Sequence, residues 1–171
     1  MSFRKIPADG ITLRPFHILD KEWALLSAGN ADDFNTMTVS WGGMGTLWSR
    51  PVATVYVRPQ RYTRTFMERE DCFTLSFFGG AHSKDLGHLG KASGRDGDKL
   101  AATSLTPRFD TAAGAPLFEQ AALSLVCRKL YAAPFEPARF TDPSLAPEFY
   151  PQSDFHIVYI GEIVEAYANE S

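Results

Sequence analysis

Short runs of β-branched and aromatic residues, each bounded by glycine, proline or asparagine, recur along most of the chain. Runs of this kind are typical of β-strands separated by turns. We expect strands over residues 23–28, 34–41, 51–57, 72–78, 121–130 and 155–167. Only short helices fit between them, at 61–69 and near 84–89. About six strands with so little helix favour a closed antiparallel barrel over a doubly wound parallel sheet.

Two stretches are less regular than the rest, although the first contains the short helix expected near 84–89. Residues 79–99 are rich in glycine and charge, and residues 133–151 are rich in proline, so we expect the second stretch to be an irregular excursion between two strands. Glycine and proline are otherwise spread along the chain, which argues against a long linker. With 171 residues, the whole chain (1–171) is expected to form a single domain.

Charge and composition exclude several classes of function. The formal net charge is −3, which gives no overall field to recruit nucleic acid or an anionic membrane. Residues 1–15 lack the apolar core of a secretory signal, and no stretch reaches the roughly 20 apolar residues of a membrane span. Cys72 and Cys127 each lie inside an apolar run, where buried, reduced thiols are expected. We therefore expect a cytoplasmic protein without a nucleic-acid or membrane partner.

The familiar phosphate, metal and nucleophile motifs do not match this sequence. Gly87–Lys91 ends in Gly-Lys but lacks the other residues of a P-loop. Gly42–Gly45 lacks the spacing of a dinucleotide fingerprint, and we interpret it as a turn where a backbone approaches a ligand. Arg95–Asp98 has too few carboxylates for a calcium loop. The four histidines form no ligand pattern with the cysteines, and no serine occupies a nucleophile elbow. We expect neither a bound metal nor a covalent nucleophile.

Two neighbouring segments carry the parts of a cofactor site. On the strand expected at 34–41, the alternation of strand residues separates one face from the other: Asn35, Met37, Val39 and Trp41 against Phe34, Thr36, Thr38 and Ser40. A flat aromatic cofactor needs an apolar wall, which Met37 or Trp41 would supply, and residues 58–64 offer three arginines for a phosphate. These are the parts of an FMN site. They also fit a half-buried sheet face and a solvated helix start, and on chemistry alone both interpretations stay open.

A family resemblance favours the cofactor. The chain is similar to the flavin reductase-like family of FMN-binding split barrels, and most of all to its flavoredoxin-type members. The resemblance spans roughly residues 22–168 and is carried, in order, by Leu25–Asn30, Phe34–Trp41, Ser49–Pro51, Arg61–Thr63, Cys72–Ser76, Ser93–Lys99 and His156–Ile163. It implies a six-stranded antiparallel split β-barrel of Greek-key type with a few short helices, and FMN at a homodimer interface.

The same resemblance assigns roles to residues. The isoalloxazine and ribityl chain would be lined by Asn35, Thr36, Met37, Thr38, Ser40 and Trp41. The phosphate would be held by Ser49, Arg61 and Thr63 with support from Tyr62, while Lys84 and Lys99 would lie near the cofactor. His156 matches a histidine five residues before a family glycine and is the candidate catalytic residue. Phe155 stands where the family often has aspartate, and a histidine merely packed under the last strand is an equal alternative.

The function implied is an NAD(P)H:flavin oxidoreductase, in which a reduced nicotinamide passes hydride to the flavin. One alternative is a flavoredoxin-like electron carrier with tightly bound FMN and a protein redox partner. Another is a ligand-binding barrel without redox chemistry. A homodimer is expected from the resemblance and from the thirteen phenylalanines, more than a small core readily hides.

Overall fold

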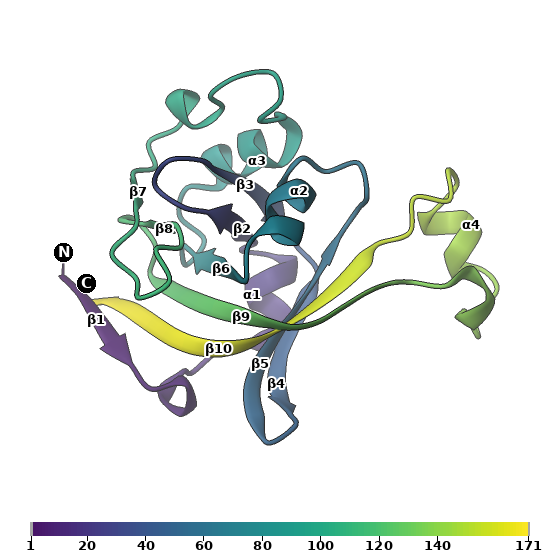
Figure 1. Ribbon diagram of the computed structural model, residues 1–171, viewed down its shortest axis with the longest axis horizontal. Coiled ribbons are helices and arrows are strands. Elements are labelled where there is room, and N and C mark those ends of the chain that lie inside the picture. Colours follow the sequence, from purple (N-terminus) through teal and green to yellow (C-terminus); the bar gives the residue numbers. More distant parts are fainter. Residues whose placement is uncertain (1, 171) are drawn as a thin grey trace.

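In the computed structural model, which describes residues 2–170, one large antiparallel sheet forms the body of the molecule (Figure 1). Its strands are β1 (Ser2–Ile6), β2 (Ala24–Gly29), β3 (Phe34–Val39), β4 (Gly42–Leu47), β5 (Arg50–Val57), β6 (Cys72–Phe77), β9 (Leu123–Pro134) and β10 (Ile157–Glu170). A small ladder joins β7 (Pro107–Arg108) to β8 (Leu117–Phe118). The helices are α1 (Pro15–Asp20), α2 (Thr63–Arg69), α3 (Ser83–Lys91) and α4 (Leu145–Phe149), with 3₁₀ turns η1 (Ala8–Gly10), η2 (Leu100–Ala102) and η3 (Pro137–Arg139).

The strand order makes the sheet curl into a split barrel. The order is β3-β2-β6-β9-β10-β5-β4, with β1 added to β10. The two edge strands, β3 and β4, are separated in sequence by only Ser40 and Trp41, yet no ladder joins them within the described chain. Edges connected by two residues must lie close together, so the sheet bends round until they meet and stays split between them.

Most elements expected from the sequence are confirmed. Each of the six expected strands has a counterpart, in β2, β3, β5, β6, β9 and β10, and the two expected helices correspond to α2 and α3. The mainly β, antiparallel split barrel is therefore confirmed, although the large sheet has more strands than the six expected. The additional strands are β1 and β4, and β3 ends at Val39 instead of residue 41.

The interpretation of Gly42–Gly45 as a turn is wrong, because these residues form most of β4. Gly42 pairs with Val55 and Gly45 with Val52 on β5. At Gly42 a Cβ atom would lie 2.6 Å from the carbonyl oxygen of Thr54, so only glycine permits this close backbone approach. The glycines that suggest a turn thus have a packing role in a strand.

A single large core fills the barrel. Its fully buried side chains include Leu26, Val55, Phe73, Leu75 and Leu125, contributed by four different strands. Packing is close where β10 passes β6 and β9. There a Cβ at residue 161 would lie 2.6 Å from the Phe73 ring, which explains a glycine in the middle of the longest strand. A smaller cluster, including Leu86, Leu89 and Phe118, anchors α3 beside the sheet.

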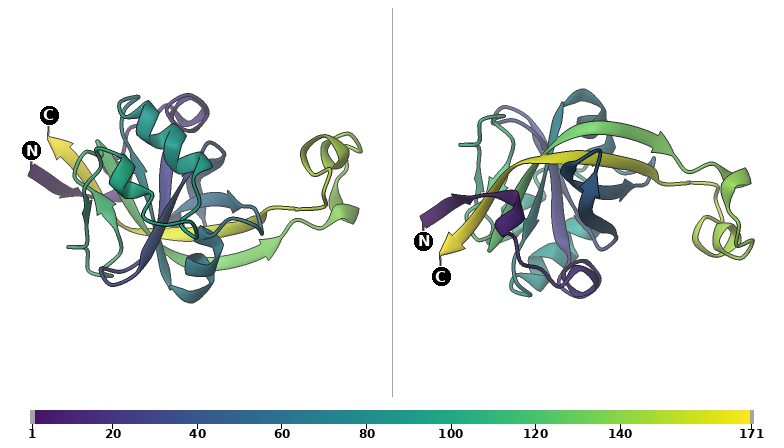
Figure 2. Two further views of the ribbon diagram at one scale, coloured as in Figure 1. Left: turned by 90° about the horizontal axis from the view of Figure 1, so that it is seen from above. Right: turned by 90° about the horizontal axis from the view of Figure 1, so that it is seen from below.

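The proline-rich stretch between β9 and β10 forms an arm that projects from the body, as expected of an irregular excursion (Figure 2). It contains η3 and α4 and has its own aromatic cluster, in which the Tyr150 and Phe155 rings stack with centroids 4.7 Å apart and Phe140 packs on both.

All thirteen phenylalanines lie in the described part, and Phe16 alone is largely exposed, at 91%. The number of phenylalanines therefore gives little support of its own for a second copy of the chain.

Both cysteines are free thiols, Cys127 fully buried and Cys72 half-buried on the neighbouring strand. Burial raises the pKa of both thiols, so they stay protonated at neutral pH. Among residues 2–170, no helix is both long and apolar enough to cross a membrane.

Candidate functional site

The site begins where β3 meets the start of α2. Asn35 on β3 is buried, and its Nδ2 donates a 2.7 Å hydrogen bond to Oγ1 of Thr63, the first residue of α2. Gly94 packs directly against this pair, because a Cβ there would lie 2.3 Å from Asn35 Oδ1 and 3.1 Å from the Tyr62 ring. The loop after α3 is thus held against β3 and α2 at one point.

Two cations meet at the C-terminal end of α3. Arg61 Nη1 donates to the Gly90 carbonyl at 2.8 Å, and Lys99 Nζ donates to the carbonyls of Leu89 and Ala92 at 3.3 and 3.2 Å. Helix C-termini carry unsatisfied carbonyls and a partial negative charge, which accounts for the attraction. Within the described chain, neither cation forms an ion pair with a carboxylate.

The surroundings of these two cations are electrostatically unfavourable for them. Both side chains are half-buried. Burial, and then the neighbouring charge of Arg61, lower the pKa of Lys99 to about 8. Burial also lowers the pKa of Arg61, which nevertheless stays charged. Two partly desolvated positive charges with only carbonyl partners form a site that an anion would stabilise.

Two cavities share Arg61 and Met37. The first, which we call the Trp41 cavity, encloses about 210 Å³, and its walls include Met37, Ser40, Trp41, Tyr56, Arg61 and His156. The second, the Thr63 cavity, encloses about 200 Å³, and its walls include Asn35, Met37, Arg61, Tyr62, Thr63 and Lys99. One cavity therefore offers aromatic and thioether surface, and the adjoining one offers the Thr63 hydroxyl and four cationic residues, because Lys91 and Arg95 line it together with Arg61 and Lys99.

His156 closes one side of the Trp41 cavity. It is 7% exposed, its Nδ1 lies 2.8 Å from the Tyr150 hydroxyl, and its ring centroid lies 5.5 Å from that of Trp41. Burial first, and the charge of Arg58 second, lower the pKa of His156 to about 4. At neutral pH the imidazole is therefore uncharged.

Within the described residues, no hydrogen bond joins Asp154 to His156. The Oδ2 atom of Asp154 accepts hydrogen bonds from Arg58 and from Gln60, and these bonds lower the pKa of the carboxyl. Phe155, which stands in the usual aspartate position, stacks inside the arm instead. The carboxylate in this chain thus fixes the base of the arm to the segment that follows β5.

The structure brings together all but two of the side chains that the sequence nominates. Those that line the two cavities are Asn35, Met37, Thr38, Ser40, Trp41, Arg61, Tyr62, Thr63, Lys99 and His156. Thr36 is buried beside them, where its hydroxyl accepts from Ser27, and Thr38 donates to the Leu86 carbonyl. The hydroxyls of β3 thus serve partly to fix the site.

Ser49 and Lys84 are the two exceptions. Ser49 lies at the tip of the β4–β5 hairpin with φ 57°, exposed and next to a different cavity. Lys84 is exposed on the first turn of α3 and lines neither the Trp41 cavity nor the Thr63 cavity. Within one chain, these two residues do not join the site.

Several site residues were not nominated from the sequence. Tyr56, Arg58 and Gly94 line the cavities, and Tyr150 supports His156. Arg58 and Gly94 lie in segments that carry the family resemblance or the arginine cluster, so neighbouring motifs pointed to them. Tyr56 and Tyr150 gave no sequence signal, because one sits in an apolar strand and the other in the irregular arm. Among residues 2–170, no three His, Cys, Asp or Glu side chains gather as a metal site would require.

Comparison with solved structures identifies the fold. The flavoredoxin of Methanosarcina acetivorans superimposes with a TM-score of 0.66 at 22% identity, covering 87% of this chain and 69% of that one. The FMN-binding domain of a flavin reductase-like enzyme from Shewanella baltica OS155 gives 0.70 at 18% identity, over 98% and 77%. The NADH:FAD oxidoreductase of Streptomyces globisporus C-1027, in complex with NAD and FAD fragments, gives 0.66 at 17% identity, over 86% and 74%. No curated protein sequence matches the chain.

The family model described as the flavin reductase like domain matches residues 18–171, almost the whole chain. The match includes β3, the start of α2 and the loop after α3, which are the segments that build the two cavities. The chain belongs to the flavin reductase-like domain family.

Proposed function

We propose that the chain is an NAD(P)H:flavin oxidoreductase that binds the FMN moiety across the Trp41 and Thr63 cavities. The observation that carries this proposal is the meeting of Arg61 and Lys99, two half-buried cations without a carboxylate partner in the described chain. A phosphate held between them, with the Thr63 hydroxyl as a third donor, would supply the missing negative charge. The shared wall at Met37 and Arg61 puts this site next to the aromatic cavity, as a ribityl phosphate requires.

The residues of the Trp41 cavity fit a flat aromatic ring. Met37 and Tyr56 supply polarizable surface, and Trp41 is 45% exposed at the open side. An open side leaves one ring face accessible to a second planar ring, such as a nicotinamide. The bound flavin would supply the redox chemistry by accepting hydride from the reduced nicotinamide. This chain would orient the ring, and Lys99 would stabilise negative charge nearby.

We propose that His156 supports the cofactor site by holding neighbouring side chains in place. A neutral imidazole fixed to Tyr150 and packed against Trp41 holds the aromatic wall in place. With a pKa of about 4, the ring does not carry the proton that a general acid needs at neutral pH. The geometry therefore supports a positioning role in preference to proton transfer.

We further propose a homodimer with the cofactor near its interface. Exposed apolar side chains cluster at the tip of the β4–β5 hairpin, where Trp48 is 57% and Leu47 36% exposed. Ser49 follows Trp48 directly. In a homodimer, the β4–β5 hairpin of one chain would bring its Ser49 to the phosphate bound by the other chain. Sedimentation of the protein with FMN should give twice the chain mass, and Trp48→Glu should shift it toward the monomer. A monomer that binds FMN at full occupancy would contradict the proposal.

Titration and anaerobic mixing test the function. FMN should bind and raise the melting temperature, because a ligand of the native state stabilises it by mass action. Addition of NADH or NADPH without oxygen should then bleach the flavin absorbance. Tight FMN binding with no reduction by either nucleotide would instead support the flavoredoxin-like carrier with a protein partner. Failure to bind any flavin would leave a barrel without redox chemistry.

The two free thiols suit a reducing compartment and support a cytoplasmic location.

A further inference from the structure

The largest of the cavities adjoining the site is a cleft of about 730 Å³ beside the Thr63 cavity. We call it the Phe34 cleft, and its walls include Phe34, Asn35, Tyr62, Gly94, Lys99 and Ala101. It shares Asn35, Tyr62, Gly94 and Lys99 with the Thr63 cavity, and it shares no residue with the Trp41 cavity. The three cavities therefore follow one another in a line, with the two cations in the middle.

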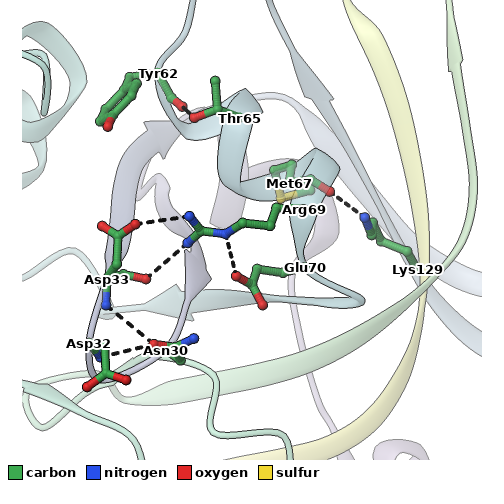
Figure 3. Close-up of polar contacts among 9 residues, drawn as sticks. All are labelled: Asn30, Asp32, Asp33, Tyr62, Thr65, Met67, Arg69, Glu70 and Lys129. Carbon is green, nitrogen blue, oxygen red and sulfur yellow. Dashed lines mark hydrogen bonds and ion pairs between the residues drawn. The ribbon is translucent and has the colours of Figure 1, made fainter.

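One wall of the cleft is held rigidly. Asn30 Oδ1 accepts from the backbone N–H groups of Asp32 and Asp33, which fixes the β2–β3 turn. Arg69 at the end of α2 donates to the Asp33 carboxylate at 3.0 Å and to its carbonyl at 3.4 Å (Figure 3). The turn and α2 are thus tied together, and Tyr62 stands at the other end of the same helix.

Aromatic rings line this cleft. Phe34 is half-buried and meets Phe109 edge to face at 5.2 Å, and Tyr62 meets Phe66 in the same way at the same distance. The Arg95 guanidinium lies 4.9 Å from the Tyr62 centroid. Rings fixed on one side by such contacts present their other surface to the cleft, where a planar base would find a stacking partner.

The charges change sign along the line of cavities. Lys99 stands at the boundary between the Thr63 cavity and the Phe34 cleft, where its ammonium has only carbonyl partners. Beyond it, the cleft is bordered by Asp32 and Asp98, and by Asp33, whose carboxylate is paired with Arg69. Carboxylates accept hydrogen bonds from hydroxyl groups and repel phosphate, so the far part of the cleft suits a sugar and a base. The boundary suits a second phosphate.

From this order we propose that the Phe34 cleft receives the adenosine end of FAD, with the diphosphate lying across Lys99. The sequence of cavities, aromatic ring then cations then aromatic cleft, is the sequence of parts in FAD: isoalloxazine, diphosphate, adenosine. The proposal rests on the proposed function, because it takes the FMN half to occupy the first two cavities. It predicts that FAD, which fills all three, binds more tightly than FMN.

A matched pair of variants on η2 tests the cleft. Ala101 and Ala102 are both exposed, but only Ala101 lines the cleft. In the wild type, fluorescence titration should give a dissociation constant for FAD at least about tenfold below that for FMN, the change that one good interaction makes. Ala101→Trp should remove this difference by filling the cleft and leave the FMN value within about twofold. Ala102→Trp should leave both values unchanged.

The outcomes separate the inference from the proposed function. Equal affinity for the two flavins in the wild type, or an equal effect of Ala101→Trp on both, would overturn the assignment of the cleft while leaving flavin binding intact. If neither flavin binds, the proposed function fails as well. If Ala101→Trp raises the KM for NADH and leaves both flavins unaffected, the cleft holds the adenosine of the nicotinamide nucleotide, and the FAD assignment is overturned.

Discussion

Asn35 Nδ2 donates a hydrogen bond of 2.7 Å to Thr63 Oγ1, and both side chains are buried. The bond joins the second residue of β3 to the first residue of α2. Because the Thr63 oxygen accepts from the amide, its own O–H stays free to donate toward the Thr63 cavity. A structural bond between two elements thus also sets the direction in which a proposed phosphate donor points.

The Asn35–Thr63 pair should show strong coupling in a double-mutant cycle. Removing either partner leaves a buried polar group unsatisfied, so Asn35→Ala and Thr63→Val should each lower the free energy of unfolding by about 1–3 kcal/mol. The double variant should lose less than the sum, with a coupling of roughly 0.5–3 kcal/mol in urea unfolding. Additive losses within about 0.3 kcal/mol would show that the two side chains act independently.

Arg61→Ala should weaken FMN binding much more than riboflavin binding. Loss of a charge-assisted hydrogen bond to the phosphate costs about 1.5–3 kcal/mol, which is roughly tenfold to a hundredfold in dissociation constant. Riboflavin has no phosphate to lose, so its affinity should change little. Calorimetric titration of both flavins measures the difference.

Arg64 supplies the control for this variant. It lies on the first turn of α2, where its guanidinium pairs with Glu68 and lines neither of the two proposed cofactor cavities. Arg64→Ala should leave both affinities unchanged. Equal losses for FMN and riboflavin in Arg61→Ala would mean that Arg61 acts only by holding Gly90 and the end of α3.

Flavin affinity should depend on the protonation of Lys99. In the free protein its pKa is about 8, so the side chain is charged at pH 7 and largely neutral at pH 9. Binding of a phosphate favours the charged form, so the affinity for FMN should be constant near pH 7 and fall as the pH rises above 8. Riboflavin affinity should stay flat over the same range. Lys99→Arg should keep tight FMN binding at pH 9, and a wild type whose FMN affinity does not change between pH 7 and 9 would exclude Lys99 from the phosphate site.

The sequence predicts the strands better than it predicts their edges. Period-two alternation marks β6 and β9 because one row of side chains in each enters the core, as Leu75 and Leu125 do. β4 was missed because its glycines suit a turn equally well. Only the distance from Gly42 to the Thr54 carbonyl, set by a strand elsewhere in the chain, shows why glycine is needed there. Non-local packing of this kind leaves no local signal.

In the candidate site too, the sequence identifies residues within one segment but not the contacts between distant segments. Arg61 and Thr63 lie two residues apart in a recognisable motif, so the sequence nominates both. Their placement with Lys99 around one cavity depends on how the end of α3 meets α2, which no local pattern encodes. Tyr150 approaches His156 from an irregular arm, and this contact was beyond sequence reasoning.

The last prediction concerns His156, whose positioning and proton-transfer roles differ in their pH dependence. The unfolded chain takes up a proton at this residue near its ordinary pKa of 6.5, whereas the folded chain does so only near pH 4. Between these values the unfolded state binds more protons, so the stability contributed by His156 is complete above about pH 6.5 and is lost as the pH falls toward 4. His156→Gln should reduce the slope of unfolding free energy against pH in this window by up to about 1.4 kcal/mol per pH unit. The imidazole resonance missing from the variant should titrate near pH 4 in the wild type.

Because the ring stays neutral from pH 6 to 8, flavin reduction should show no titration that disappears in His156→Gln. A midpoint between pH 6 and 7 that is lost in the variant would instead establish His156 as a proton donor or acceptor in the reaction.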